Sequence, residues 1–197
     1  PKTKTMNYRN EVYRKMIHFG SAVFPISYYY SLSREQMLWL LGGLSALFLI
    51  GELLRMNVGS FKRFFRLIFS AIVRDSEDHT ITGATTVFIA GFLTVLIFER
   101  PVAIFAMLIL SLADATAALI GRKWGNHSLF EKSVEGTMTF LIVALALAFL
   151  LPDLPRAGAV AAAGIATIAE VLPSPIDDNL IVPLSAATTI SFFYLIA

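Results

Sequence analysis

The sequence predicts an all-α integral membrane protein with about seven transmembrane helices and one amphipathic helix at the membrane interface. Of its 197 residues, 56% are hydrophobic and only 15% are charged, and the mean hydropathy is +0.70. A soluble domain of this length would leave much of that apolar surface in water, whereas lipid-facing side chains need not be polar. The length and the lack of a soluble-looking segment indicate one membrane-embedded domain over residues 1–197.

The composition also excludes several classes of function. A formal net charge of +2 is too small to indicate a nucleic-acid partner, and the basic residues stand in short clusters beside apolar runs. Such clusters are typical of topology signals and lipid-headgroup contacts. The absence of cysteine excludes disulfides, thiolate catalysis and cysteine-bound zinc. Residues 1–15 are charged but lead into Pro25 and a tyrosine run, so we do not expect a removable signal peptide.

Seven apolar segments approach the length of about 20 residues that a helix needs to cross a bilayer. The first is interrupted by Pro25 and ends in tyrosines that suit the membrane interface. Between the second and third, residues 60–74 place phenylalanines and isoleucines at helical spacing opposite Lys62, Arg63 and Arg66, which predicts an amphipathic helix on the membrane surface. The expected spans are 15–31, 35–54, 82–98, 101–121, 134–151, 157–173 and 179–197.

The distribution of lysine and arginine predicts the orientation of these spans. Of the 16 such residues, all but Arg34, Arg100 and Arg156 fall on one side, in the N-terminus and after the second and fourth spans. The positive-inside rule therefore places the N-terminus in the cytoplasm and the C-terminus outside.

Polar residues within or beside the spans gather on that same side. Ionisable groups in a membrane are costly and usually functional. A transporter would carry them near the midplane, whereas here they indicate a cleft that opens from the cytosol. The residues are His18, Glu52, Thr80, Thr82, Asp114, Glu170, Asp177, Asp178 and Asn179.

Residues 121–137 predict a phosphate site. Gly121 and Gly125 would permit tight turns, and a lysine and a hydroxyl come just before the next helix, which suits phosphate binding by a helix N-terminus. The Walker A pattern is absent. The alternative is that Ser133 only caps the helix and Lys132 only marks the cytoplasmic side. The nearby carboxylate of Asp114, which needs a cation partner when buried, favours the functional interpretation. The other candidate residues are Arg122, Lys123, Gly136 and Thr137.

A second polar cluster combines Glu170 with residues 177–179. Adjacent carboxylates repel, and a magnesium ion between them and a nucleotide phosphate would relieve that repulsion. The alternative is a solvated loop in which Asp178 or Asn179 caps the last helix. Near the N-terminus, Arg14, Lys15 and His18 share one helix face, although a single histidine there is more often structural. Glu52 and Arg55 are expected to pair at a membrane boundary.

Four motifs follow one another along the chain: RKMIHFGS at 14–21, SLADATAALIGRKWGNH at 111–127, EKSVEGT at 131–137 and IDDNLIVP at 176–183. In this order they resemble the polyprenol kinase family, which includes dolichol kinase, phytol kinase and CTP-dependent diacylglycerol kinase. The resemblance covers nearly the whole chain, although this chain is shorter than eukaryotic dolichol kinases. The related CDP-diacylglycerol synthases carry a longer lysine motif, which fits less well.

The resemblance implies a magnesium-dependent kinase that moves a phosphoryl group from CTP to a lipid alcohol on the cytoplasmic side of the membrane. Asp114 would act as the base, with His18 as the competing candidate. Glu52, Glu170 and Asn179 would support the site. Phosphate binding falls to Arg14, Lys15, Gly121, Arg122, Lys123, Lys132, Ser133, Gly136 and Thr137, and metal binding to Asp114, Glu135, Asp177 and Asp178.

The acceptor and the competing functions stay open in the sequence. An isoprenoid alcohol such as a polyprenol, dolichol or phytol is favoured over diacylglycerol. One rival is a cytidylyltransferase that makes a CDP-lipid from a lipid phosphate, and another is a transporter of an anionic solute. The sequence does not define an oligomeric state.

Overall fold

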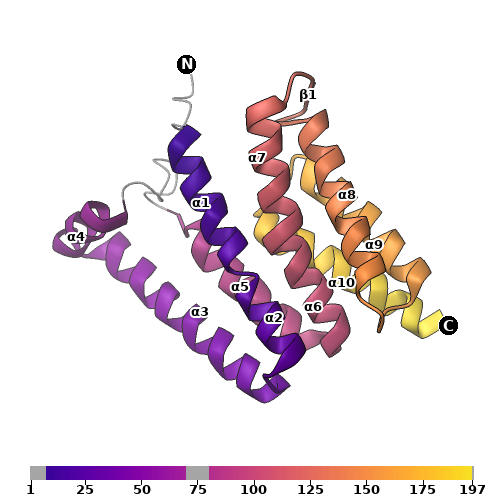
Figure 1. Ribbon diagram of the computed structural model, residues 1–197. Helices are drawn as coiled ribbons and strands as arrows, with labels where there is room; N and C mark the ends of the chain where they lie inside the picture. The colour runs from indigo at the N-terminus through magenta and orange to yellow at the C-terminus, as the bar shows by residue number, and fades with distance from the viewer. Residues whose placement is uncertain (1–7, 70–79, 197) are drawn as a thin grey trace.

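The computed structural model describes residues 8–69 and 80–196, which are mostly helical (82%). The chain runs as a bundle with one small hairpin at the end where α1 begins (Figure 1). The elements are α1 (Tyr8–Gly20), α2 (Val23–Tyr30), α3 (Arg34–Asn57), α4 (Gly59–Phe69), α5 (Gly83–Ile97), α6 (Arg100–Leu108), η2 (Ile109–Ala113), α7 (Asp114–Trp124), β1 (Ser128–Leu129), β2 (Lys132–Ser133), α8 (Val134–Leu150), α9 (Arg156–Val171) and α10 (Asp178–Ile196).

Helices occupy each of the expected spans, but they differ in their capacity to cross a membrane. Within the described ranges, three are long and apolar enough: α3, the continuous helix of α6, η2 and α7, and α10. The apolar helices α5 and α8 are shorter, with 15 and 17 residues. The chain is therefore a membrane protein, while the number of seven spans and the direction of insertion stay predictions.

The first expected span is divided into two helices. The break falls between α1 and α2, and Pro25 lies in the first turn of α2 rather than at the break. A proline is tolerated in a first turn because its missing N–H would have no partner there. Ser21, at the break, donates a hydrogen bond to the carbonyl oxygen of His18.

The core lies around the helix formed by α6, η2 and α7, which Figure 1 shows running through the bundle. Every residue from 102 to 111 is buried, as expected for a helix that is apolar on all sides. Small residues let α9 pack closely against α10 and α8, and α10 in turn packs on α6. Ala159, Ala163 and Ala166 of α9 have no exposed surface.

Three arginines tie the helix ends together at the end of the bundle opposite the hairpin. Arg34 donates to the carbonyl oxygens of residues 95 and 96, Arg100 to those of residues 28 and 29, and Arg156 to those of residues 148, 149 and 151. Each guanidinium satisfies carbonyls at a helix C-terminus. These are the three basic residues that the orientation rule places outside, so the fold itself gives them a local structural role.

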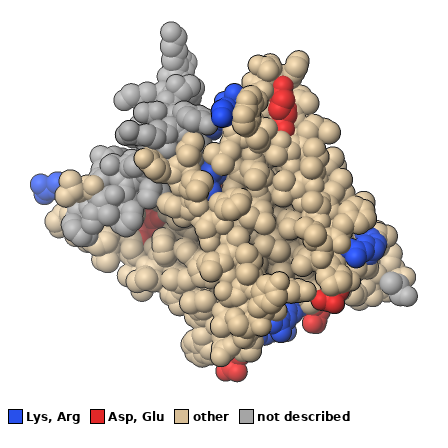
Figure 2. All heavy atoms as spheres, in the orientation of Figure 1, with Lys and Arg blue, Asp and Glu red and all other residues tan. Residues whose placement is uncertain are grey.

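Charged side chains gather toward the ends of the molecule on the face shown in Figure 2, and most of the surface between them is uncharged. The helix α4 begins two residues after α3 ends, and one of its faces carries aromatic rings. The guanidinium of Arg55 lies 5.6 Å from the centre of the Phe65 ring. The predicted amphipathic helix is thus present over residues 59–69, while residues 70–74 lie outside the described ranges.

The hairpin is the one described element that departs from the all-α expectation. Its antiparallel strands pair Ser128 with Ser133 and Leu129 with Lys132. At the turn, Phe130 adopts a left-handed conformation with φ of 52°, which costs a non-glycine residue about 1–2 kcal/mol. The hairpin lies between the fourth and fifth expected spans, and its Lys132 reaches α9 and α10.

Candidate active site

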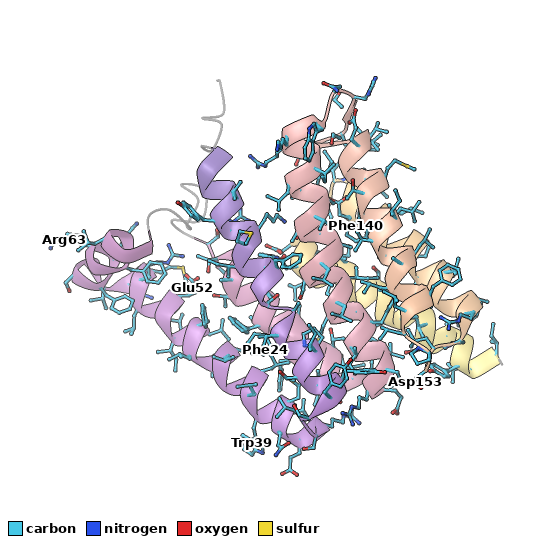
Figure 3. All side chains as sticks on the ribbon, viewed as in Figure 1. Phe24, Trp39, Glu52, Arg63, Phe140 and Asp153 are labelled. Atoms are coloured by element: carbon cyan, nitrogen blue, oxygen red, sulfur yellow. The ribbon has the colours of Figure 1, made fainter. Side chains whose placement is uncertain are left out.

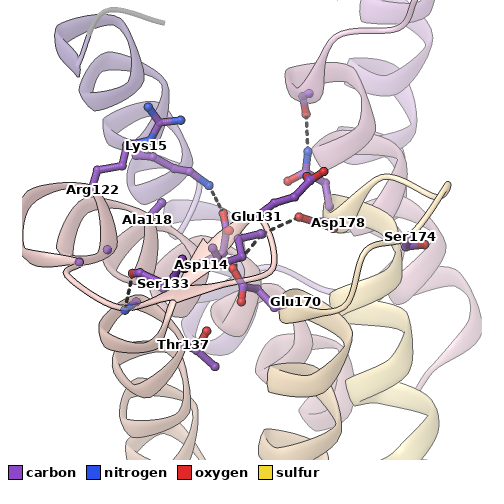
Figure 4. Close-up of a pocket in the computed structure, with 18 of the residues that line it drawn as sticks. Lys15, Asp114, Ala118, Arg122, Glu131, Ser133, Thr137, Glu170, Ser174 and Asp178 are labelled. Atoms are coloured by element: carbon purple, nitrogen blue, oxygen red, sulfur yellow. Dashed lines mark hydrogen bonds and ion pairs between the residues drawn. The ribbon is translucent and has the colours of Figure 1, made fainter. Parts of the chain in front are cut away.

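A cavity of about 790 Å³ opens at the hairpin end of the bundle. This volume lies within the range of about 300–1,000 Å³ that is typical of ligand pockets. Figure 4 shows side chains from α1, α7, the hairpin and α10 converging on it. Its wall includes most of the predicted site residues: Arg14, Lys15, Asp114, Gly121, Arg122, Lys132, Ser133, Gly136, Thr137, Glu170, Asp177, Asp178 and Asn179.

Asp114 lies on the cavity wall with a lysine as its counter-ion. The residue is 6% exposed, and its Oδ2 is 2.6 Å from the Nζ of Lys15 and 3.5 Å from the Nδ1 of His18. A buried carboxylate is stabilised in its charged form by such a cation. A π-helical turn, η2, immediately precedes Asp114, and such insertions are frequent at functional sites. The break between α1 and α2 also contacts η2, where the hydroxyl groups of Ser21 and Ser111 hydrogen bond at 2.9 Å.

Lys132 joins three elements around the cavity. Its Nζ donates to Glu170 Oε1 at 2.9 Å and to Asp178 Oδ2 at 2.8 Å. Burial lowers the pKa of Lys132, but the Glu170 carboxylate and the hydrogen bonds to Asp178 and Glu170 outweigh it and hold that pKa above its usual value. The lysine is therefore positively charged at neutral pH, and it connects β2 to α9 and α10.

The start of α10 is organised by Asp177, which sequence reasoning did not choose as the cap. Asp177 Oδ1 accepts from the backbone N–H of Asn179 at 2.8 Å, so this residue and not Asp178 or Asn179 caps the helix. Asn179 in turn donates to Gly83 O at 3.3 Å and to Thr86 Oγ1 at 3.0 Å. Its position against the first turn of α5 brings Gly83 into the cavity wall.

Gly83 and Thr86 were missed by the sequence analysis. The available signal was the hydroxyl-rich start of the third span, where Thr82, Thr85 and Thr86 surround a glycine. Two further wall residues, Asn126 and Glu131, lie in or beside the hairpin. Both lie inside the four sequence motifs, but their residue types alone do not distinguish them from ordinary loop residues.

Gly121 and Gly136 allow close packing of α7 on α8, so Gly121 does not form the tight turn expected of it, while Gly125 is the C-cap residue that ends α7. Gly121 lies within α7, and a Cβ there would be 2.7 Å from Ser133 Oγ. A Cβ on Gly136 would be 2.9 Å from the carbonyl oxygen of Ala117. Because only hydrogen atoms fit between these backbones, the two helices approach closely and form one side of the cavity.

At the start of α8, two of the backbone amides that could bind phosphate are already hydrogen bonded. Ser133 caps the helix, since its Oγ accepts from the N–H of Gly136 at 3.1 Å. The N–H of Val134 donates to the carbonyl oxygen of His127. The N–H groups of Val134 and Gly136 therefore already have partners, and the phosphate site at this helix start stays a prediction. Thr137 Oγ1, in contrast, is buried in the cavity wall without a hydrogen-bond partner among the described residues.

Four predicted residues lie outside the cavity wall. Lys123 places its ammonium 4.4 Å from the centre of the Trp124 ring. Glu135 accepts hydrogen bonds from the Nδ1 and backbone N–H of His127 and from the N–H of Asn126, so its contacts organise the loop. His18 and Glu52 are the other two, and His18 contacts the cavity through Asp114.

Glu52 is the centre of a separate buried network between α3 and α5. Its Oε1 accepts from the backbone N–H and the hydroxyl of Thr82 and from the hydroxyl of Thr85. Arg55 donates to its Oε2 and also to the carbonyl oxygen of Thr80. The expected pair of Glu52 and Arg55 is therefore present but buried, and it holds the turn that begins α5 (Figure 3).

The cavity contains oxygen donors that suit a magnesium ion, although the described residues include no ready-made cage. They hold no group of three or more histidine, aspartate or glutamate side chains arranged around one point. Glu170 Oε2, however, is buried without a hydrogen-bond partner in the described ranges. Magnesium commonly takes one or two carboxylates and completes its shell with water and phosphate. The residues present fit a metal that arrives with a phosphate ligand.

Comparison with known proteins finds two yeast lipid kinases to which the chain is distantly similar. It is 25% identical over 156 residues to CTP-dependent diacylglycerol kinase 1 of Schizosaccharomyces pombe, covering 70% of this chain and 72% of the kinase. It is 28% identical over 120 residues to CTP-dependent diacylglycerol kinase 1 of Saccharomyces cerevisiae, covering 60% of this chain and 41% of the kinase. These distant homologues support the broader class of CTP-dependent lipid kinases.

A third relative shows the family itself. The chain is 30% identical over 150 residues to the uncharacterized protein RP860 of Rickettsia prowazekii, covering 75% of this chain and 73% of that protein. The chain therefore belongs to the same family as this Rickettsia protein. No protein-family model and no solved structure matches it.

Proposed function

We propose that this protein is a CTP-dependent lipid alcohol kinase whose active site is the cavity at the hairpin end. The observation that carries the proposal is the position of Asp114. It stands in an apolar helix long enough to cross the membrane, yet it faces a cavity lined by arginine and lysine. A carboxylate at the membrane boundary beside phosphate-binding groups is what transfer to a lipid hydroxyl requires. The two yeast relatives support the same reaction class.

The charges of the cavity suit a nucleotide that arrives with a cation. Four lysine or arginine side chains and five carboxylates line it among the described residues. A free triphosphate would meet net repulsion from such a wall, whereas a metal-bound triphosphate would not. Arg14 and Arg122 lie on the wall beside α7 and would contact phosphate oxygens. Asp177 and Asp178 would hold the magnesium ion, which neutralises phosphate charge when bound.

The transfer itself needs one proton acceptor and good alignment. The lipid hydroxyl oxygen forms a bond to the terminal phosphorus while the bond between that phosphorus and the bridging oxygen breaks, which releases CDP. Asp114 accepts the hydroxyl proton, and Lys15, 2.6 Å away, keeps the carboxylate charged and oriented until then. His18 lies 3.5 Å from Asp114 and is not among the residues of the cavity wall, so we assign it to positioning.

The acceptor is proposed as a membrane lipid with a primary hydroxyl. The yeast relatives are diacylglycerol kinases, which makes diacylglycerol the first acceptor to test. An isoprenoid alcohol, the acceptor expected at the level of the sequence, is the alternative. Either lipid would keep its apolar tail among the exposed apolar side chains of α1, such as Met16 and Ile17, while its hydroxyl reaches Asp114.

The test uses purified protein in detergent with magnesium, CTP or ATP labelled on the terminal phosphate, and a panel of diacylglycerol, phytol and a polyprenol. We expect label in a lipid product with CTP and much less with ATP. The labelled lipid identifies the acceptor class. No labelled lipid with any acceptor and either nucleotide would overturn the proposal.

A cytidylyltransferase that forms a CDP-lipid is the second candidate, because it would use the same nucleotide and the same membrane location. Supplying a lipid phosphate in place of a lipid alcohol distinguishes the two reactions. Release of pyrophosphate together with a CDP-lipid would favour the second candidate. CDP release together with a lipid phosphate supports the kinase.

A further inference from the structure

Lys132 lies between two carboxylates in a position that a metal ion could take. Its Nζ is 2.9 Å from Glu170 Oε1 and 2.8 Å from Asp178 Oδ2. Figure 4 shows the carboxylates of Glu170 and Asp178 converging from α9 and α10 on the same part of the cavity. A cation shared by two carboxylates from different helices is also the arrangement in which magnesium binds proteins and nucleotides together.

The lysine satisfies this pair of carboxylates only in part. One ammonium group against two carboxylates leaves one negative charge uncompensated. Glu170 is 5% exposed, and its Oε2 is buried without a hydrogen-bond partner among the described residues. Native proteins rarely leave a buried charged oxygen unsatisfied, and such an atom often marks a missing water or ion. A divalent cation would balance both charges and could bring a water to Oε2.

The same lysine is also well placed for phosphate. Lys132 lies two residues before the start of α8 and lines the cavity with Ser133 and Thr137. A lysine side chain has a flexible stem of four carbons and three donors, so it can change partners without movement of the backbone. While it is held by Glu170 and Asp178, it cannot give its full charge to a nucleotide.

We infer that Lys132 is a placeholder cation: a divalent metal displaces its ammonium group from Glu170 and Asp178, and the released lysine then binds the nucleotide phosphates. Glu170 thereby becomes a metal ligand. The exchange deepens the proposed kinase function and rests on it for the identity of the phosphate ligand. In the absence of nucleotide, the lysine competes with the metal and keeps its affinity low. Metal and nucleotide are therefore expected to bind together.

The test measures Mn²⁺ binding by the full chain in detergent, without nucleotide or lipid, from the electron paramagnetic resonance signal of free Mn²⁺. Lys132→Gln keeps a hydrogen-bond donor but removes the charge, and Lys132→Arg keeps the charge. We expect Lys132→Gln to bind Mn²⁺ about tenfold more tightly than the parent protein, because a unit positive charge beside the ion has been removed. Lys132→Arg should bind like the parent.

A second set of variants tests whether Glu170 and Asp178 bind the metal ion. Adding Glu170→Gln or Asp178→Asn to Lys132→Gln should remove the gain in affinity, while Asp153→Asn, at the opposite end of the molecule (Figure 3), should not. Equal Mn²⁺ affinity of Lys132→Gln and Lys132→Arg would overturn the inference. So would a gain that persists after Glu170→Gln.

A measurement on the unaltered protein covers the case in which a variant does not fold. The reactivity of Lys132 toward an amine-selective reagent, followed by mass spectrometry, should rise several-fold when Mn²⁺ is added. Unchanged or reduced reactivity would contradict the exchange. Neither readout depends on phosphoryl transfer. An inactive protein that still shows the exchange would refute only the kinase, and an active one without it would refute only the inference.

Discussion

Asp114 is 6% exposed on the cavity wall, and its carboxylate is the proposed proton acceptor. Asp114→Asn removes that function while keeping shape and most hydrogen bonding. We expect kcat to fall by about 10²–10⁴-fold, the usual contribution of a positioned base, with little change in the thermal unfolding temperature. The assay follows label transfer to lipid, and Asp153→Asn serves as the control. Activity within a few-fold of the parent would remove Asp114 from the mechanism.

Ser133 is the residue for which the sequence left two interpretations open. The structure shows that it caps α8 through Gly136, and the loss of such a cap costs about 1 kcal/mol. We expect Ser133→Ala to lower the unfolding temperature by a few degrees, with Ser133→Thr close to the parent. Phosphate binding by the same hydroxyl would add a rise in KM for CTP. A change in KM without any change in stability would contradict the capping role.

The packing of α7 on α8 depends on glycine. A Cβ on Gly136 would come within 2.9 Å of the Ala117 carbonyl oxygen, whereas nothing lies within 4 Å of a Cβ on Gly164 in α9. Gly136→Ala should therefore destabilise the protein by about 1–3 kcal/mol, as overpacking does. Gly164→Ala should be neutral or slightly stabilising because alanine favours a helix. Thermal unfolding of both variants in detergent tests the contrast. Equal stability would show that α7 and α8 can separate at no cost.

The helices could largely be predicted from hydropathy, because a bilayer demands long apolar segments and their positions follow from composition alone. The residues that contact these polar side chains in the folded chain could not be predicted from the sequence. Lys123 and Arg122 are neighbours in sequence, yet only Arg122 lines the cavity, because successive residues point to different faces of a helix. Asn179 meets Gly83, 96 residues away, and no local pattern in the chain specifies such a contact.

At the scale of the whole molecule, the orientation in the membrane is still a prediction. It places the hairpin in the cytoplasm and the α8–α9 turn outside, because most lysines and arginines lie on the hairpin side. The sequence contains no cysteine, so a cysteine introduced at one position is the only thiol that a maleimide can label. In sealed right-side-out vesicles, we expect Asp153→Cys to react with an impermeant maleimide and Ser128→Cys to react only after permeabilisation. The reverse pattern would contradict the predicted orientation and place the site outside.

The central claim is that the cavity moves the terminal phosphoryl group of a nucleotide to a lipid hydroxyl. The most direct measurement is a single reaction with CTP labelled differently on its α- and γ-phosphates, run with the acceptor lipid and with both the parent protein and Asp114→Asn. The account predicts that only the γ-label enters lipid and that Asp114→Asn abolishes this transfer. Appearance of the α-label in lipid, or transfer that is unaffected by Asp114→Asn, would contradict it.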